Sequence, residues 1–350
     1  MTIATYFSDE DFYKAPAHIE RVRLFEKRLR SSRKRATNKK RRSIPSALKR
    51  KAKEIISLRQ KILKLKPDLV IAFEAGKGSL IATALVNSNT PLIVSERNNP
   101  DSKVKPRRTL AKKMRPLIYH RGVVCSVQTD GFAKWCEENW RIKPIVTPNQ
   151  LMPDELVNWE EVSKRRANNN FIALGRYVPQ KGFADLLRAW QIVEREDEEL
   201  ELDLYGFEDG EYLRKLAVEL GLKRARINSA TNNVRSVLDS SRCLISPSYY
   251  EGFPNVVLEA LGRGTPVIAT PSSDAIHMMA ENGAIRVVPV GDPDSLARAI
   301  IAEKSSDFSE RSRLAWEAGS QFSWENVAPS WEAAIEAASK TRGFQMIRFR

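Results

Sequence analysis

The feature that most constrains the fold of this chain is a regular alternation of short apolar runs with longer segments of helical periodicity. The apolar runs are rich in Val, Ile and Leu, as buried strands of parallel sheets are. Each run leads through a loop into a helix-length segment. Such alternation is typical of βαβ units around parallel sheets and predicts an α/β fold.

The alternation occurs in two blocks, and 350 residues are enough for two domains of this kind. The strands expected in the N-terminal block are residues 68–73, 91–95, 122–127 and 145–147, and the expected helices are 76–88, 106–120 and 130–140. The strands expected in the C-terminal block are residues 171–174, 201–205, 243–246, 266–269 and 285–289.

The pattern lapses between the two blocks. Two proline residues and a polar run of arginine and asparagine interrupt it, as in an interdomain connection. We therefore divide the chain into an N-terminal Rossmann-like domain, a linker, a C-terminal Rossmann-like domain and a terminal helix. The corresponding residues are 1–150, 151–170, 171–320 and 321–340.

The composition argues against several classes of protein. An apolar content of 42% with 29% charged residues is globular, and the longest apolar runs fall far short of the roughly 18 residues that a membrane-spanning helix needs. The first residues lack the basic and then apolar pattern of a secretory signal, so we expect a cytoplasmic protein. The three cysteines have no paired spacing, which predicts neither a disulfide framework nor a zinc site.

Charge is distributed unevenly along the chain. The first 150 residues carry 34 Lys and Arg against 13 Asp and Glu, whereas residues 151–350 carry 24 against 30. The whole basic excess of this chain, whose formal net charge is +15, therefore belongs to the N-terminal half. Such an excess predicts an anionic partner for that half.

The densest basic segment runs from Arg21 to Lys66, and three interpretations of it are open. It is a solvated helix face, a surface for anionic lipid headgroups or a lipid diphosphate, or a nucleic-acid surface. Nucleic-acid surfaces usually combine basic with aromatic side chains, and no aromatic residue lies between Leu29 and Val70. We therefore expect an anionic membrane surface as partner, a peripheral location on the inner face of the membrane, and no nucleic acid.

A loop with two glycines and two cations follows the expected strand at 171–174. Gly175 permits a tight turn after the strand, and Gly182 permits close backbone approach at the start of the next helix. Arg176 and Lys181 lie between them, near the positive end of that helix, where a diphosphate would be stabilised. Taken alone, a solvated connection is the simpler interpretation of this loop.

A second informative segment follows the strand at 243–246 and enters a helix near Pro254, a residue suited to a first helical turn. The amides of residues 255–257 would then point into the crevice beyond the strands. Glu251 before this helix and Glu259 within it can accept hydrogen bonds from sugar hydroxyls. The alternative is a loop glutamate and an ordinary helix glutamate, but apolar neighbours would make an unpaired carboxylate at Glu259 costly.

These two segments closely resemble the donor-site motifs of glycosyltransferase family 4. The matching residues are Gly175-Arg176 with Lys181-Gly182, Tyr250-Glu-Gly-Phe-Pro-Asn255 with Glu259, and Gly264-Thr-Pro-Val-Ile-Ala-Thr270. The resemblance covers about residues 170–290. It implies the GT-B fold, in which two Rossmann-like domains face each other across a cleft. By this likeness residues 1–150 form the acceptor-side domain, residues 171–320 form the donor-binding domain, and the terminal helix at 321–340 crosses back to the N-terminal domain.

The resemblance also implies retaining transfer of a sugar from a nucleotide diphosphate sugar, a UDP-hexose or UDP-N-acetylhexosamine, with no cofactor and no catalytic metal. By this likeness Arg176 and Lys181 would stabilise the leaving diphosphate and Glu251 would hold the donor sugar, so these three residues are the expected catalytic ones. Glu259 would bind the ribose. The other donor-binding residues that the likeness implies are Gly175, Gly252, Phe253, Pro254, Asn255 and Val256.

The N-terminal half resembles, more loosely, a subgroup of bacterial surface-polysaccharide transferases. Its matching segments are residues 93–100, 127–130 and 146–149. The expected acceptor is therefore a glycan or a lipid-linked glycan in cell-surface polysaccharide synthesis. Glu96, Arg97 and Asn98 follow a strand at the cleft, and they either contact donor or acceptor or merely structure their loop.

One departure from the family concerns the start of the chain. The family opens with a strand and a glycine-rich loop, whereas residues 1–6 resemble the unit after these, so the resemblance predicts that a first βα unit is absent. Two other classes of function stay open: a catalytically inactive glycosyltransferase-like scaffold, and a nucleic-acid-binding protein that uses residues 21–66. An epimerase of nucleotide sugars is the nearest enzymatic alternative.

Overall fold

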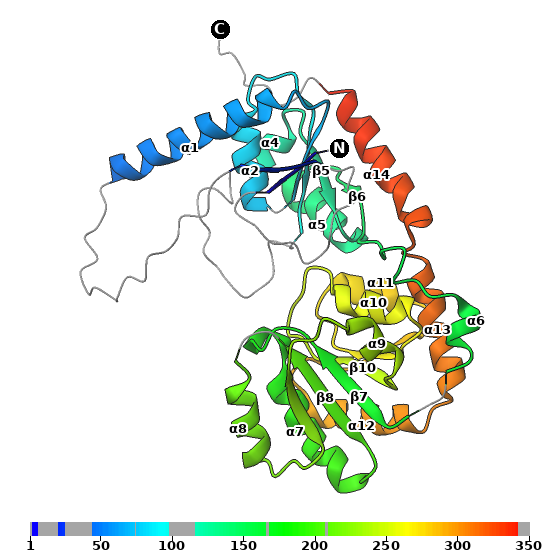
Figure 1. Ribbon diagram of the computed structural model, residues 1–350. Helices are drawn as coiled ribbons and strands as arrows, with labels where there is room; N and C mark the ends of the chain where they lie inside the picture. The colour runs from blue at the N-terminus through cyan, green and yellow to red at the C-terminus, as the bar shows by residue number, and fades with distance from the viewer. Residues whose placement is uncertain are drawn as a thin grey trace.

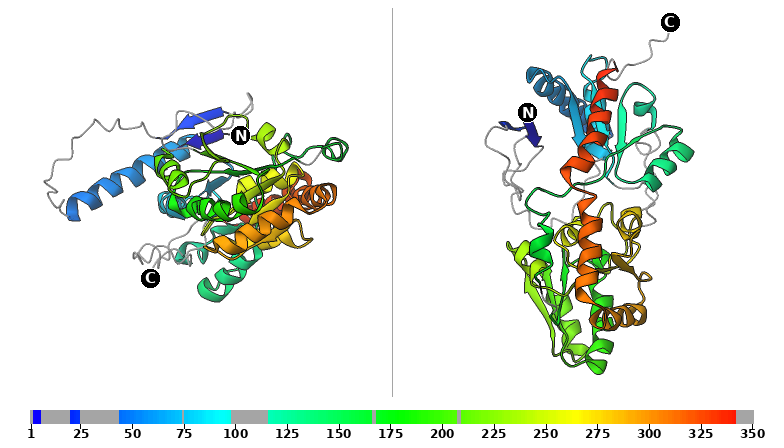
Figure 2. Two further views of the ribbon diagram at one scale, coloured as in Figure 1. Left: turned by 90° about the horizontal axis from the view of Figure 1, so that it is seen from below. Right: turned by 90° about the vertical axis from the view of Figure 1, so that its right-hand side faces the viewer.

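The computed structural model consists of two α/β domains joined by two passages of the chain (Figure 1). It describes residues 2–5, 20–24, 44–73, 75–97, 116–165, 168–206 and 209–341. The N-terminal domain lies above the C-terminal one in Figure 1, and the right-hand view of Figure 2 shows α13 (Phe308–Ser320) and α14 (Trp324–Ser339) running along both. The predicted α/β fold with parallel sheets is confirmed. None of the helices within the described ranges combines the length and the apolarity needed to span a bilayer.

The C-terminal domain is built on a six-stranded parallel sheet in the order β12-β11-β10-β7-β8-β9. The chain winds outward from β7 to β9 and then, starting again beside β7, from β10 to β12. Ligands of such sheets bind at this reversal, beyond the carboxyl ends of the two central strands. The strands are β7 (Asn170–Leu174), β8 (Glu201–Gly206), β9 (Ala225–Ser229), β10 (Cys243–Ser246), β11 (Val267–Ala269) and β12 (Ile285–Val287).

Helices cover both faces of this sheet and bury two apolar clusters. Phe171 of β7 and Trp190 of the helix that follows it pack together in one cluster, with ring centroids 6.0 Å apart. The sequence specifies several helix starts directly: the Asp292 side chain, for example, accepts a hydrogen bond of 3.0 Å from the Ser295 amide. The helices are α6 (Trp159–Val162), the 3₁₀ turn η1 (Pro179–Lys181), α7 (Phe183–Glu196), α8 (Glu211–Glu219), α9 (Val234–Asp239), α10 (Asn255–Gly262), α11 (Asp274–Ala280), α12 (Pro293–Lys304) and α13.

The N-terminal domain contains a four-stranded parallel sheet in the order β3-β4-β5-β6 and a separate parallel pair formed by β1 and β2. The second half of α1 packs on this domain through Leu58 and Ile62, which lie one turn apart, while its first half projects outward (Figure 1). The elements are β1 (Thr2–Thr5), β2 (Glu20–Arg23), α1 (Ile44–Lys64), β3 (Val70–Phe73), α2 (Ala75–Ala84), β4 (Leu92–Ser95), α4 (Pro116–Tyr119), β5 (Val124–Val127), α5 (Asp130–Trp140) and β6 (Ile145–Val146).

The two passages of the chain between the domains run side by side. The first follows β6 and the second separates α13 from α14, and a hydrogen bond of 2.8 Å from the Leu151 amide to the Phe322 carbonyl joins them. After the second passage α14 lies against the N-terminal sheet. Its Ala334 and Ala338 are fully buried in a cluster with Ile93 of β4.

One strand of the C-terminal sheet escapes prediction from the sequence. β9 is an edge strand whose side chains are half-buried or exposed, so it lacks the apolar run that marks the others. Arg226 of this strand forms an ion pair of 2.7 Å with Asp203 of β8 and another of 2.7 Å with Glu201. Ion pairs between neighbouring strands, and not buried apolar side chains, thus contribute to holding β9 against β8.

Two other expectations differ from the structure. The stretch expected as a linker, residues 151–170, contains the helix α6. The helix expected at 76–88 ends at Ala84, three residues before Asn87 adopts a left-handed backbone with φ of 56°. Of the helix expected at 106–120, residues 116–119 form α4 and residues 106–115 lie outside the described ranges.

The packing of α14 predicts a position-dependent effect of charge. We expect Ala334→Asp to lower the melting temperature strongly, because it buries a carboxylate without a partner at a cost of several kcal/mol. Ala333→Asp, at the exposed neighbouring position, meets only the weaker helix propensity of Asp, about 0.5 kcal/mol. Thermal unfolding followed by circular dichroism compares the two variants. Equal melting temperatures would contradict the docking of α14.

Candidate active site

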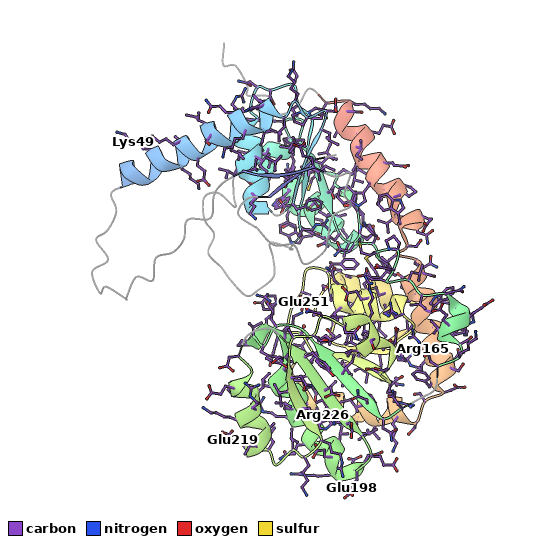
Figure 3. The ribbon with its side chains drawn as sticks, in the orientation of Figure 1. Lys49, Arg165, Glu198, Glu219, Arg226 and Glu251 are labelled. Atoms are coloured by element: carbon purple, nitrogen blue, oxygen red, sulfur yellow. The ribbon has the colours of Figure 1, made fainter. Side chains whose placement is uncertain are left out.

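A cavity of about 550 Å³ lies between the two domains. It opens beside the carboxyl end of β10, and Figure 3 shows Glu251 at the edge of the C-terminal domain that faces the N-terminal one. Its size is within the range of small-molecule sites. The lining residues are Arg97, Gln128, Asn149, Gln150, Met152, Glu155, Glu251, Gly252, Phe253, Asn255, Leu258 and Glu259.

The loop after β7 makes direct backbone contact with the loop after β10. Gly182 has a φ of +68°, and a Cβ atom built on it would lie 2.0 Å from the carbonyl oxygen of Pro247. Gly175 has a φ of +155°, its amide donates to the Tyr205 carbonyl at 3.0 Å, and a Cβ there would lie 3.2 Å from Cε of Lys181. Gly182 thus allows the two loops to meet at the point where the winding of the sheet reverses, and Gly175 allows the Lys181 side chain to lie close to the start of its own loop.

An ion pair joins these two loops. Nζ of Lys181 lies 2.7 Å from Oε1 of Glu251, and the Ser248 hydroxyl donates to the same oxygen at 2.9 Å. Both charged side chains are largely buried, with exposed fractions of 17% and 13%. Amide contacts support the arrangement, because Gln180 donates to the Tyr250 carbonyl at 2.7 Å. The structure therefore brings together Lys181 and Glu251, which are 70 residues apart in the sequence.

The remaining residues expected at the donor site fall into two groups. Gly252, Phe253, Asn255 and Glu259 line the cavity together with Glu251. The Arg176 side chain is exposed and makes no hydrogen bond or ion pair with the described residues, so it lies on the loop but outside the lining.

The start of α10 differs in detail from the expectation. Pro254 is the N-cap of this helix and not a residue of its first turn, and the Val257 amide donates to the Pro254 carbonyl at 3.0 Å. The expected set of free amides at 255–257 is therefore reduced by one. The Val256 side chain packs against the apolar cluster under α10 and does not line the cavity, so any contribution of this residue to ligand binding comes from its backbone.

The N-terminal wall of the cavity is formed by residues that follow β4, β5 and β6. Arg97 donates from Nη1 to Oδ1 of Asn149 at 2.6 Å, and Asn149 donates across the cleft to Oδ1 of Asn255 at 2.5 Å. The Arg97 guanidinium lies over the ring of Phe73, 4.8 Å from its centroid, and burial lowers the pKa of Arg97 to about 10. Gln128 contacts the same Asn149 side chain.

The neighbours of Arg97 have different positions. Glu96 is fully buried and absent from the cavity lining; its carboxylate accepts a hydrogen bond from the Tyr119 hydroxyl, and its amide donates to the Ser126 carbonyl at 2.8 Å. Glu96 therefore structures the loop, which was one of the two interpretations of its segment. Asn98, the third candidate there, lies outside the described residues.

The sequence did not single out six lining residues: Gln128, Asn149, Gln150, Met152, Glu155 and Leu258. Gln128 and Asn149 each follow a strand of the N-terminal sheet, so the rule that ligands bind beyond the carboxyl ends of strands could have identified them. Glu155 is a different case. It lies in the interdomain connection, its Oε2 accepts from the Met152 amide at 2.7 Å, and burial raises its pKa.

Comparison with solved structures identifies the class of fold. The crystal structure of WaaG, a glycosyltransferase involved in lipopolysaccharide biosynthesis, superimposes with a TM-score of 0.67 over 93% of this chain and 88% of that one, at 15% sequence identity. The fold of this chain is that of the GT-B glycosyltransferases, as the resemblance in the sequence implied.

Comparison of sequences adds a family. Residues 168–302 match the family model described as Glycosyl transferases group 1. An uncharacterised glycosyltransferase of Haemophilus influenzae is 27% identical over 234 residues, which are 64% of this chain and 63% of that protein. The lipopolysaccharide core biosynthesis glycosyltransferase LpsE of Rhizobium meliloti is 33% identical over 145 residues, 41% of this chain and 42% of that protein. The chain thus spans less than two thirds of these relatives, and the match to the family model lies within its C-terminal half.

The contact between the two loops predicts different costs for two glycine substitutions. An alanine at position 182 would adopt a strained left-handed backbone, and its Cβ atom would also displace the Pro247 carbonyl. An alanine at position 221, where φ is +70° and no atom lies within 4 Å, would cost only the backbone strain of about 1–2 kcal/mol. We expect Gly182→Ala to lower the melting temperature more than Gly221→Ala. Thermal unfolding of both variants measures the difference, and equal values would show that the loops do not need this contact.

Proposed function

We propose that this protein is a retaining glycosyltransferase that moves a sugar from a nucleotide diphosphate sugar to a glycan or lipid-linked acceptor. The observation that carries the proposal is the Lys181–Glu251 ion pair at the edge of the interdomain cavity, with Glu259 eight residues further along the wall. It lies where parallel sheets bind ligands, in a domain that matches group 1 glycosyl transferases. UDP-hexose or UDP-N-acetylhexosamine is the proposed donor.

The proposed chemistry depends on charge at the leaving group. When the bond between the sugar and the diphosphate breaks, negative charge grows on the diphosphate, so cations near it stabilise the transition state more than the ground state. We assign this role to Arg176 and Lys181, not to a metal ion. Arg176 is exposed and unpaired among the described residues, and it is therefore available to a phosphate.

The remaining steps use the other loop and the acceptor. Glu251, held by Lys181 and Ser248, would accept hydrogen bonds from hydroxyls of the donor sugar, and Glu259 would accept those of the ribose. The acceptor oxygen would attack the anomeric carbon on the face that the diphosphate leaves, and its proton would pass to a diphosphate oxygen. No protein nucleophile is needed in this proposal.

The proposed place of the reaction is the synthesis of cell-surface polysaccharide at the inner face of the membrane. The similarity to LpsE, which is named for lipopolysaccharide core biosynthesis, supports it. The structure of α1 supports contact with anionic lipid. Lys49, Lys51 and Lys53 are exposed on its first half, and Figure 3 shows Lys49 far from the body of the domain.

Two other cations of the same helix have structural roles. Arg59 donates to the carbonyls of Ala84 and Val86, both at 2.8 Å, and Lys61 donates to the Leu24 carbonyl. These contacts hold the second half of α1 to the domain. We therefore assign lipid contact to the projecting half of α1 alone; residues 25–43 of the basic segment lie outside the described ranges.

The donor site is tested by thermal-shift titration with UDP, GDP and their sugars in the presence of EDTA. We expect one nucleotide to stabilise the protein selectively, by about 2.7 kcal/mol at 100 times its Kd. Lys181→Gln and Glu259→Ala should remove most of this shift. Glu219→Ala, on the outer surface of α8 far from the cavity, should not (Figure 3).

The outcomes of this titration separate the alternatives. No shift with any nucleotide in a folded protein would overturn the proposed transfer and favour an inactive scaffold. A shift that needs added divalent metal would overturn the assignment of charge neutralisation to side chains.

The lipid surface is tested with vesicles of phosphatidylglycerol and of phosphatidylcholine. Replacing Lys49, Lys51 and Lys53 together by Gln should weaken sedimentation with the anionic vesicles, because each Lys near such a surface contributes about 1 kcal/mol. A control triple variant removes the same charge from exposed lysines of the C-terminal half, namely Lys164, Lys215 and Lys223. Equal binding by the two triple variants would refute lipid contact through α1.

A further inference from the structure

The N-terminal wall of the cavity has a distinct chemical character. Among the described residues, the lining of this wall carries one cation, Arg97, and the amides of Gln128 and Asn149, but no carboxylate. The carboxylates of the lining belong to Glu155, Glu251 and Glu259, from the connection and the donor side. The adjacent Glu96 is buried against Tyr119 and does not line the cavity, so no carboxylate among the described lining residues of this wall accompanies the cation.

Arg97 has little compensation within the described part of the protein. No carboxylate there lies within ion-pair distance of its guanidinium, and its hydrogen bond of 2.6 Å goes to the neutral amide of Asn149. Glu251, a carboxylate of the same cavity lining, is already paired with Lys181 at 2.7 Å. The ring of Phe73 covers one face of the guanidinium, which leaves its edge as the part that can meet a ligand.

Burial without a counter-charge is unfavourable for the charged form of arginine, and the lowered pKa of Arg97, about 10, expresses this. Its charge is nevertheless retained at neutral pH. A carboxylate or phosphate beside it would offset the cost of burial and would accept two parallel hydrogen bonds from the planar guanidinium. A neutral sugar hydroxyl would do neither.

We propose that Arg97 binds a carboxylate or phosphate carried by one of the two sugars that meet in the cavity, so that the transferred or the accepting sugar is acidic. This inference rests on the proposed transfer reaction and adds the substrate class to it. The anionic group can belong to the donor, as in a uronic acid, or to the acceptor, as in a uronic acid or a sugar phosphate. Both sources present the same chemistry to the guanidinium.

A structural role is the competing explanation. Phe73 packs against Trp331 of α14 with ring centroids 6.1 Å apart, Arg97 covers Phe73, and Asn149 bridges Arg97 to Asn255 at the start of α10. Arg97 could thus serve only to hold this chain of contacts between the domains. The test therefore needs a measurement that a purely structural role would not change. The preference of the protein for a charged over a neutral ligand is such a measurement.

The experiment measures affinities by isothermal titration calorimetry on the full chain. The donor arm compares UDP-glucose with UDP-glucuronic acid and GDP-mannose with GDP-mannuronic acid. The acceptor arm, at saturating UDP or GDP, compares methyl glucoside with glucuronic acid and glucose 6-phosphate. We expect the charged ligand of one arm to bind about 10- to 100-fold more tightly than its neutral counterpart. The arm that responds identifies the source of the charge.

Three variants separate the two roles of Arg97. Arg97→Gln should abolish the preference, and Arg97→Lys should keep part of it because it retains a positive charge without the planar fork. Asn149→Ala breaks the bridge to Asn255 but keeps the guanidinium, so it should weaken charged and neutral ligands to the same extent.

The contrary outcomes are equally distinct. Nucleotide binding without preference for a charged ligand in either arm would overturn this inference alone, as would a preference that survives Arg97→Gln. Equal weakening of charged and neutral ligands by Arg97→Gln would show that Arg97 does not recognise the charge of either sugar. A protein that binds neither UDP nor GDP would overturn the donor site and, with it, this inference.

Discussion

The arrangement of the candidate site depends on the direct contact of two loops at the reversal of the C-terminal sheet. The loop after β7 can approach the loop after β10 only because Gly182 has no side chain to meet the Pro247 carbonyl. That approach places Lys181 beside Glu251, where each neutralises the charge of the other in a largely buried setting. A buried carboxylate without such a partner would be costly. The burial of Glu251 therefore depends on Gly182, which lets Lys181 approach it.

Much of the fold and of the donor side of the site can be predicted from this sequence, because the relevant signals are local. Buried parallel strands are apolar runs, and the residues just after them face the ligand, which is how Lys181 and Glu251 were identified although they are 70 residues apart. β9 escaped prediction because an edge strand does not need an apolar pattern. Its Arg226 is stabilised by carboxylates of β8.

The N-terminal side of the site is harder to predict because it depends on how the two domains face each other. Glu96 and Arg97 are adjacent and looked equivalent in the sequence, yet one is buried against Tyr119 and the other lines the cavity. No local signal distinguishes them. Asn149 acquires its position from Asn255 of the other domain, so its role is visible only once both domains are in place.

The two adjacent passages between the domains also limit how the molecule can move. Two covalent connections held together by the hydrogen bond from Leu151 to Phe322 act as a single hinge axis, about which rotation is easier than translation or twisting. Because α14 packs on the N-terminal sheet and α13 on the C-terminal domain, each of the two bodies on either side of this hinge includes its own helix. The hydrogen bond between Asn149 and Asn255 spans the cavity and must break when the angle between the bodies widens. A wider angle between the domains and an intact Asn149–Asn255 hydrogen bond therefore exclude each other.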